Sequence, residues 1–90
     1  MKLNLDKNLI SLKGEPLPEK LNDILADILA MSSTVRPAKM MAWAVNLVND
    51  GEFEVNKSDI QLIKELVENN MRIVNLAKAQ ILDEIEKLEF

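Results

Sequence analysis

The stretch at residues 38–48, AKMMAWAVNLV, constrains the fold more than any other part of this chain. Only Lys39 and Asn46 in it are polar, and the single tryptophan, Trp43, lies at its middle. A helix with apolar side chains on nearly every face is unstable at a water-exposed surface. The stretch therefore predicts a central helix that is covered by the rest of the chain or by another chain.

The composition excludes several classes of protein. The 90 residues suffice for one domain, and aromatic residues make up only 3% of them, so the expected core is aliphatic and offers few surfaces on which bases stack. The absence of cysteine excludes thiol chemistry, and the absence of histidine removes the usual general base and the commonest zinc ligand. The net charge of −4 argues against direct binding to nucleic acid or to anionic membranes.

The sequence shows no pattern typical of membrane insertion or export. No apolar run reaches the roughly 18 residues of a membrane span. The N-terminus alternates polar and apolar residues, whereas a signal peptide has a basic region followed by an apolar block. We therefore expect a cytoplasmic protein.

Two short segments near the N-terminus predict a β-hairpin. Residues 2–5 alternate polar and apolar side chains, and residues 9–12 resume an apolar pattern, with Ile10 and Leu12 on one face, after the turn formers at 6–8. Gly14, in the turn that follows, is expected to take a positive φ. An isolated hairpin is marginally stable, so this one is expected to pack on helices.

Apolar residues at helical spacing predict two helices in the first half of the chain. The first spans about residues 18–31, with Pro18 at an early position where its missing N–H is harmless. The second begins near 34–37, with Thr34 as the candidate N-cap, and ends where Gly51 takes a left-handed conformation.

Two further helices are predicted in the second half. Residues 52–55 alternate and predict a very short strand or an extended loop. Ser58 and Gln61 have the spacing of a capping box, which predicts a helix from there to about residue 68. The last helix is expected over about 72–88.

Together these elements predict an α+β, predominantly helical fold. A short N-terminal β-hairpin is expected to pack on a four-helix core. The chain is expected to be one domain, residues 1–90, with the hairpin and turn at 1–16 and the helical core at 17–90.

Asp23 and Asp27 are four residues apart and share one face of the first predicted helix. Two carboxylates so placed can bind a hard cation or act as acid and base. Ion sites need further ligands, however, and the sequence supplies none beside them. We interpret the pair as a solvated face, and we predict no catalytic residue, no metal ligand and no cofactor.

The end of the last predicted helix is acidic, with Asp83, Glu84, Glu86 and Glu89. Negative charge at a helix C-terminus opposes the helix dipole. A functional interpretation is a landing patch for a basic partner, or a mimic of nucleic-acid charge. The structural alternative is a solubilising end in which Lys87 is interspersed.

The apolar stretch gives the main functional prediction. Three other helices of modest length and one hairpin would have to cover every face of residues 38–48, so the alternatives are simple burial in the core and an interface with a partner; methionine is common in cores and at adaptable binding surfaces. We predict a protein–protein interface, most simply that of a homodimer, formed by this stretch and the last helix. Its residues would be Met40, Met41, Trp43, Leu47, Ile81, Ile85 and Leu88.

The order of signals resembles that of small, mostly uncharacterised proteins encoded by tailed bacteriophages and prophages. The shared features are the Gly14-Glu15-Pro16-Leu17 turn, the segment LNDILADIL, the Lys39-x-x-x-Trp43-Ala44 helix, the connection NDGEFEVNKSD and the ending LAKAQILDEIE. The resemblance covers most of the chain and carries no catalytic signature. It implies a phage or prophage product that acts in the bacterial cytoplasm, and it assigns no site residue.

The sequence thus predicts a non-enzymatic protein that binds another protein or assembles with itself. The alternative is an acidic regulator that inhibits a host nucleic-acid-processing protein. Neither hypothesis involves direct contact with nucleic acid or a membrane.

Overall fold

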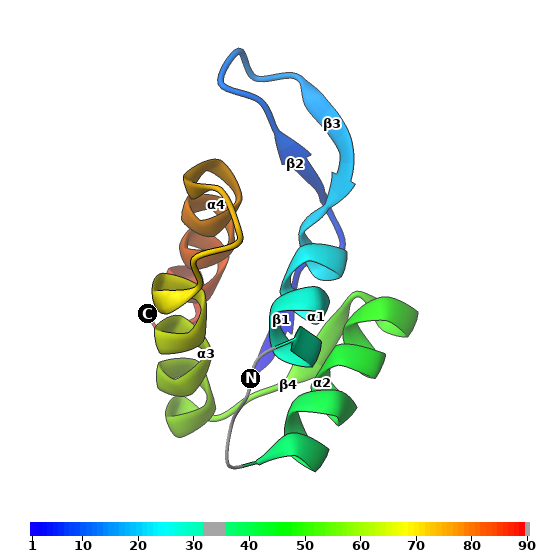
Figure 1. The fold of residues 1–90 in the computed structure, drawn as a ribbon, viewed down its shortest axis with the longest axis vertical. Helices are drawn as coiled ribbons and strands as arrows, with labels where there is room; N and C mark the ends of the chain where they lie inside the picture. Colours follow the sequence, from blue (N-terminus) through cyan, green and yellow to red (C-terminus); the bar gives the residue numbers. More distant parts are fainter. Residues whose placement is uncertain (32–35, 90) are drawn as a thin grey trace.

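The computed structural model describes residues 1–31 and 36–89 (Figure 1). Four α-helices and two small antiparallel sheets follow one another in the order β1, β2, β3, α1, α2, β4, α3, α4 and a final 3-10 turn, η1. This confirms the predicted α+β, predominantly helical class. None of the helices in the described residues has the length and apolar content to cross a membrane.

The strands pair differently from the prediction. Strand β1 (Lys2–Asn4) pairs with β4 (Glu52–Glu54), and β2 (Asn8–Ile10) pairs with β3 (Pro16–Lys20), so the predicted pairing of residues 2–5 with 9–12 was wrong. Alternation sets which side chains point inward but not which strand lies alongside. The β1–β4 register sets Leu3 opposite Phe53 and buries both. The hairpin is instead β2–β3, whose turn contains Gly14 at φ +86°.

Helix α1 (Leu21–Met31) begins three residues later than predicted. The pairing with β2, in which Lys20 lies opposite Asn8 and Pro16 opposite Ile10, keeps Pro16–Lys20 extended as strand β3. Helix α2 (Pro37–Asp50) ends as predicted at Gly51, which is left-handed with φ +74°. The candidate cap Thr34 lies outside the described residues.

Helix α3 (Lys57–Asn69) has a capping box, but not the predicted one of Ser58 and Gln61. The Asn56 side chain accepts a hydrogen bond from the Asp59 N–H at 2.9 Å, and the Asp59 carboxylate accepts one from the Asn56 N–H at 3.0 Å. The Asp59 carboxylate also binds Lys39, and this additional contact favours the earlier start.

Helix α4 (Asn75–Glu86) begins later than the predicted residue 72. The Asn70 side chain accepts hydrogen bonds from the N–H groups of Arg72 and Ile73, which forms a separate turn between α3 and α4. The helix continues into η1 (Lys87–Glu89).

The packing centre is α1 rather than the apolar stretch that forms α2. Helix α1 packs against α2, α3, α4 and β3, whereas α2 packs mainly against α1 and β4. Figure 1 shows α3 and α4 on one side, α1 and α2 on the other, and the β2–β3 hairpin projecting from the helical body. One side of α2 is consequently left without a neighbour among the described elements.

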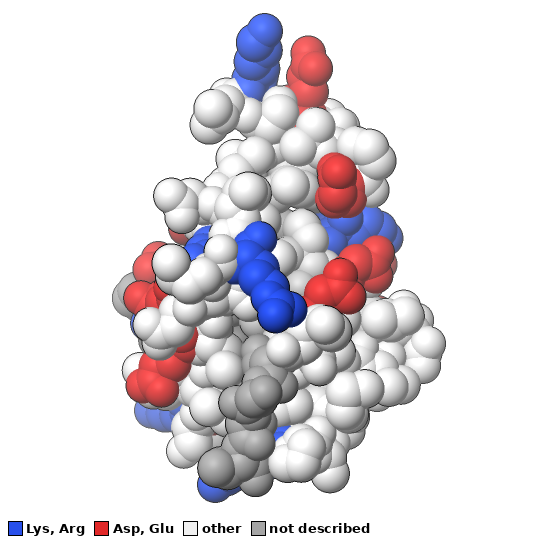
Figure 2. Space-filling view, viewed as in Figure 1, with Lys and Arg blue, Asp and Glu red and all other residues white. Residues whose placement is uncertain are grey.

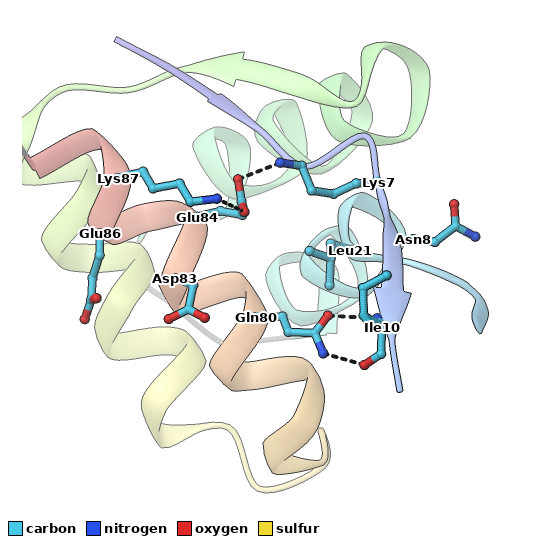
Figure 3. Close-up of a pocket in the computed structure, with 9 residues that line it drawn as sticks. All are labelled: Lys7, Asn8, Ile10, Leu21, Gln80, Asp83, Glu84, Glu86 and Lys87. Atoms are coloured by element: carbon cyan, nitrogen blue, oxygen red, sulfur yellow. Dashed lines mark hydrogen bonds and ion pairs between the residues drawn. The ribbon is translucent and has the colours of Figure 1, made fainter. Parts of the chain in front are cut away.

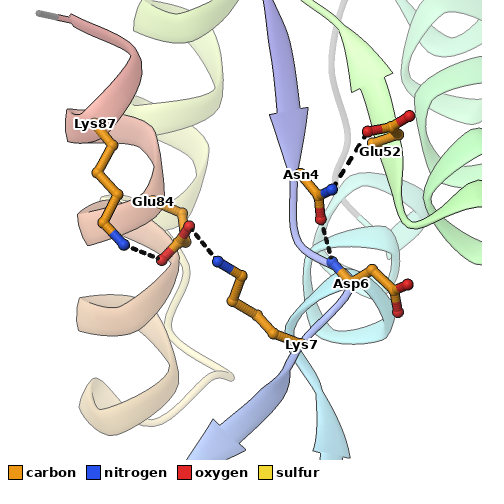
Figure 4. Close-up of polar contacts among 6 residues, drawn as sticks. All are labelled: Asn4, Asp6, Lys7, Glu52, Glu84 and Lys87. Carbon is orange, nitrogen blue, oxygen red and sulfur yellow. Dashed lines mark hydrogen bonds and ion pairs between the residues drawn. The ribbon is translucent and has the colours of Figure 1, made fainter.

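The segment that follows β1 contacts β4 and the end of α2. The Asn4 side chain accepts a hydrogen bond from the Asp6 N–H at 2.9 Å and donates one to Glu52 at 3.3 Å (Figure 4). Gly51 lies against Asp6 so closely that an added Cβ would be 2.5 Å from the Asp6 Cβ. The end of α2 is thus fixed against the N-terminal strand.

Candidate interaction surface

Helix α2 has two apolar faces with different environments. Met40, Trp43, Ala44 and Leu47 are buried against the rest of the chain. Met41, Val45 and Val48, spaced i, i+4 and i+7, are 48%, 50% and 60% exposed. The apolar stretch therefore supplies the core on one face and leaves a continuous apolar stripe on another.

The exposed stripe borders a shallow hollow between α1 and α2, which we call the α1–α2 groove. Its volume is about 280 Å³, and it is lined by Ala26, Asp27 and Ala30 of α1 and by Met41, Ala44, Val45, Val48 and Asn49 of α2. Asp27 is the charged residue of this lining. In Figure 2 the lower right of the molecule, over α2, is white, so charged side chains of the described residues do not gather there.

Most of the predicted interface residues lie in the core of the chain. Met40, Trp43, Leu47, Ile81 and Ile85 are at most 6% exposed, so this structure does not present them to a partner. Leu88 is partly buried against the same core. Met41 is the predicted interface residue that is well exposed. Self-association itself stays a prediction, and the surface available for it is the stripe that contains Met41.

The N-terminal half of α2 is tied to α3 by Lys39. Its Nζ lies 2.7 Å from Asp59 Oδ1 and 5.0 Å from the centroid of the Trp43 ring, which itself packs on Phe53 at 5.4 Å. Burial raises the pKa of Asp59, but the hydrogen bonds from Lys39 and from the Asn56 N–H outweigh it and lower that pKa below its usual value. Lys39 is thus engaged on the α3 side of α2.

A second hollow, of about 560 Å³, lies between β2 and α4 (Figure 3). The Gln80 side-chain amide accepts a hydrogen bond from the Ile10 N–H at 2.9 Å and donates one to the Ile10 carbonyl at 2.6 Å. It thereby occupies both backbone groups of Ile10 as a neighbouring strand would. These contacts attach the hairpin to the helical body.

The acidic end of α4 is partly neutralised within the chain. The Glu84 carboxylate accepts hydrogen bonds at 2.8 Å from both Lys7 and Lys87 (Figures 3 and 4). Burial raises the pKa of Glu84, but the hydrogen bonds from the two lysines outweigh it and lower that pKa. Asp83 and Glu86 remain beside this hollow. The predicted acidic landing patch is therefore smaller than the sequence indicated.

Asp23 and Asp27 both lie on exposed positions of α1. In the described part of the chain, no group of three or more acidic side chains is placed to hold a metal ion. Asp27 instead belongs to the lining of the α1–α2 groove.

No protein-family model matches this chain, and neither a curated protein nor a solved structure is significantly similar to it. The interface residues predicted from the sequence did not include Val45 and Val48. Together with Met41 they form a stripe at spacing i, i+4 and i+7. Met40, Ala44 and Leu47 form a second stripe with the same spacing, each one residue earlier. The first stripe is the exposed face of α2 and the second is the buried face.

Proposed function

We propose that this protein is a non-enzymatic interaction protein that self-assembles through the α1–α2 groove. The observation that carries the proposal is the exposed apolar stripe of Met41, Val45 and Val48 beside a groove containing alanines of α1. Scattered apolar side chains on a surface need no explanation, whereas a contiguous apolar patch is typical of an interaction site.

The expected strength of association follows from the area left to cover. Full burial of one such side chain contributes about 1.5–3 kcal/mol, so completing the burial of three half-exposed ones contributes on the order of 3 kcal/mol per groove. A partner's own apolar side chains add a similar amount. Because association costs roughly 4–15 kcal/mol in lost freedom, little surplus remains, and we expect weak self-association, in the millimolar range or weaker, so the concentrations tested must reach that range.

The resemblance to phage-encoded proteins adds a setting to this proposal. Assembly would then take place in the bacterial cytoplasm, with protein rather than nucleic acid as the partner. The net charge of −4 supports that choice of partner, because nucleic acid would repel the chain.

The test compares two aspartate substitutions on α2. Val45→Asp places a charge in the apolar stripe. Asn46→Asp places the same charge at the next residue, which is polar and exposed, and serves as the control. Sedimentation equilibrium over a range of concentrations should show association in the wild type and in Asn46→Asp but not in Val45→Asp. Wild-type protein that stays at 10.2 kDa throughout would contradict the proposal.

A further inference from the structure

The β2–β3 hairpin has little buried surface of its own. Within residues 7–20, all of which the structure describes and which we call the arm, Leu9 is buried and every other residue is half-buried or exposed. Segments with few buried apolar side chains open at a lower free energy than the fold as a whole. Figure 1 shows the hairpin projecting from the helical body, so its attachments to that body decide whether it moves separately.

The arm is anchored to the body at its base, just before Asp6. Leu5 is fully buried, its N–H donates to the Gly51 carbonyl at 2.8 Å, and its carbonyl accepts a hydrogen bond from the Asn22 N–H at 3.0 Å. Leu21, where the second strand of the arm enters α1, is 2% exposed. These contacts hold the base in place, so a movement of the arm pivots there.

Beyond the base, two side chains of α4 attach the arm to the body. The Gln80 amide binds both backbone groups of Ile10 (Figure 3). The Glu84 carboxylate accepts a hydrogen bond from Lys7 Nζ at 2.8 Å (Figure 4). Because Gln80 and Glu84 are four residues apart, they lie on the same face of the helix. Each of these contacts is at an exposed position, where a hydrogen bond or ion pair contributes little net stability.

We infer that the arm is a hinged strap, which swings away from α4 about Leu5 while the helical body stays folded. The swing breaks the Gln80–Ile10 and Lys7–Glu84 contacts together. It also draws Leu9 out of the core and widens the hollow between β2 and α4. The inference does not depend on self-assembly, because the α1–α2 groove is formed by other elements.

The experiment compares two lysine substitutions by amide hydrogen exchange of the full chain, at a concentration well below that of self-association. Lys7→Gln removes the ion pair between the arm and α4. Lys87→Gln removes the other lysine from the same Glu84 carboxylate, also at 2.8 Å, but that pair lies within the body and persists when the arm opens. Both variants keep Gln80 as the partner of Ile10.

The expected change follows from the strength of an exposed ion pair. Such a pair changes an equilibrium constant by up to about fivefold, so Lys7→Gln should speed exchange at the Ile10 N–H by about two- to fivefold. Lys87→Gln should leave that rate unchanged. In the wild type, the Ile10 N–H should exchange faster than the Leu5 N–H and with a weaker dependence on urea, since opening the arm exposes less surface than unfolding does.

Two results would overturn the inference. Equal exchange at Ile10 in the wild type and in Lys7→Gln would mean that Gln80 rotates away while the arm stays closed. Equal rates at Ile10 and Leu5, with one common dependence on urea, would mean that the arm opens only when the whole chain unfolds.

Discussion

Gly51 and Gly14 provide a matched pair of substitutions that tests the close approach between the end of α2 and the N-terminal segment. Both glycines have positive φ, at +74° and +86°. At Gly14 an added Cβ meets nothing within 4 Å, whereas at Gly51 it lies 2.5 Å from the Asp6 Cβ and 3.3 Å from the Asp6 Cα. The Asp6 Cβ is fixed to the backbone, so a change of rotamer does not relieve the overlap.

The expected magnitudes differ accordingly. The left-handed conformation costs an alanine roughly 1–2 kcal/mol, partly offset by about 0.4–1 kcal/mol from the stiffer unfolded chain, so Gly14→Ala should destabilise the protein by about 1 kcal/mol. Gly51→Ala adds the overlap with Asp6, and overpacking typically costs about 1–3 kcal/mol more. We therefore expect a total of about 2–4 kcal/mol for Gly51→Ala.

Urea denaturation followed by Trp43 fluorescence measures both values, because the indole is buried in the folded state. Asp6→Gly should recover part of the loss in the Gly51→Ala background, since it removes the atom that the alanine meets. Equal destabilisation by Gly14→Ala and Gly51→Ala would refute the reasoning, because the overlap with Asp6 should make Gly51→Ala the more destabilising change.

Three other predictions concern the two faces of α2, the Asp59 carboxylate and the Gln80 side-chain amide. Trp43→Asp should unfold the protein, since it buries a charge in the core. Met41→Asp should leave the circular dichroism spectrum unchanged and abolish association. Unfolding of both variants would contradict the division of α2 into a buried and an exposed face. Because the folded protein holds the pKa of Asp59 below its unfolded value of about 3.9, the ionised carboxylate stabilises the fold above that pH. This stability is lost as the pH falls through the lower folded pKa. Urea denaturation at several pH values should therefore show a smaller loss of stability below about pH 4 in Asp59→Asn than in the wild type. Gln80→Ala should speed hydrogen exchange at the Ile10 N–H with a loss of about 1–2 kcal/mol in stability, and unchanged exchange there would show that Gln80 does not hold the hairpin.

Much of the helical core could be predicted from side-chain spacing. The stripes that bury Leu25 and Ile28 of α1, and Ile63 and Val67 of α3, follow the helical period, and the structure buries all four side chains. The left-handed end at Gly51 was likewise predictable, because a glycine after a run of helical residues is the usual way to end a helix.

The strand partners were not predictable from local pattern. Residues 2–5 and 52–55 alternate and residues 9–12 are mostly apolar, and none of these local patterns selects a partner strand. The choice depends on burial of Leu3 against Phe53, two residues fifty positions apart. The start of α1 was not predictable either, because Pro18 also fits the first turn of a helix and the pairing of Lys20 with Asn8 decides for the strand.

The candidate surface was predictable only in part. The surplus of apolar residues at 38–48 left open whether one chain covers the whole helix, and the structure leaves Met41, Val45 and Val48 exposed. It did not indicate which side remains open, because Met40 and Met41 are equivalent in composition. Their positions relative to α1 and β4 decide that one is 2% and the other 48% exposed.

The most direct test of an association surface on α2 compares the methyl signals of the five methionines by NMR as the protein is diluted. Met41 borders the α1–α2 groove, Met40 lies in the core, and Met71 is 92% exposed in the turn between α3 and α4. We predict that the Met41 methyl shifts and broadens with increasing concentration, while the Met40 and Met71 methyls change little. A shift of Met71 without a shift of Met41, or no shift at any concentration, would contradict the account.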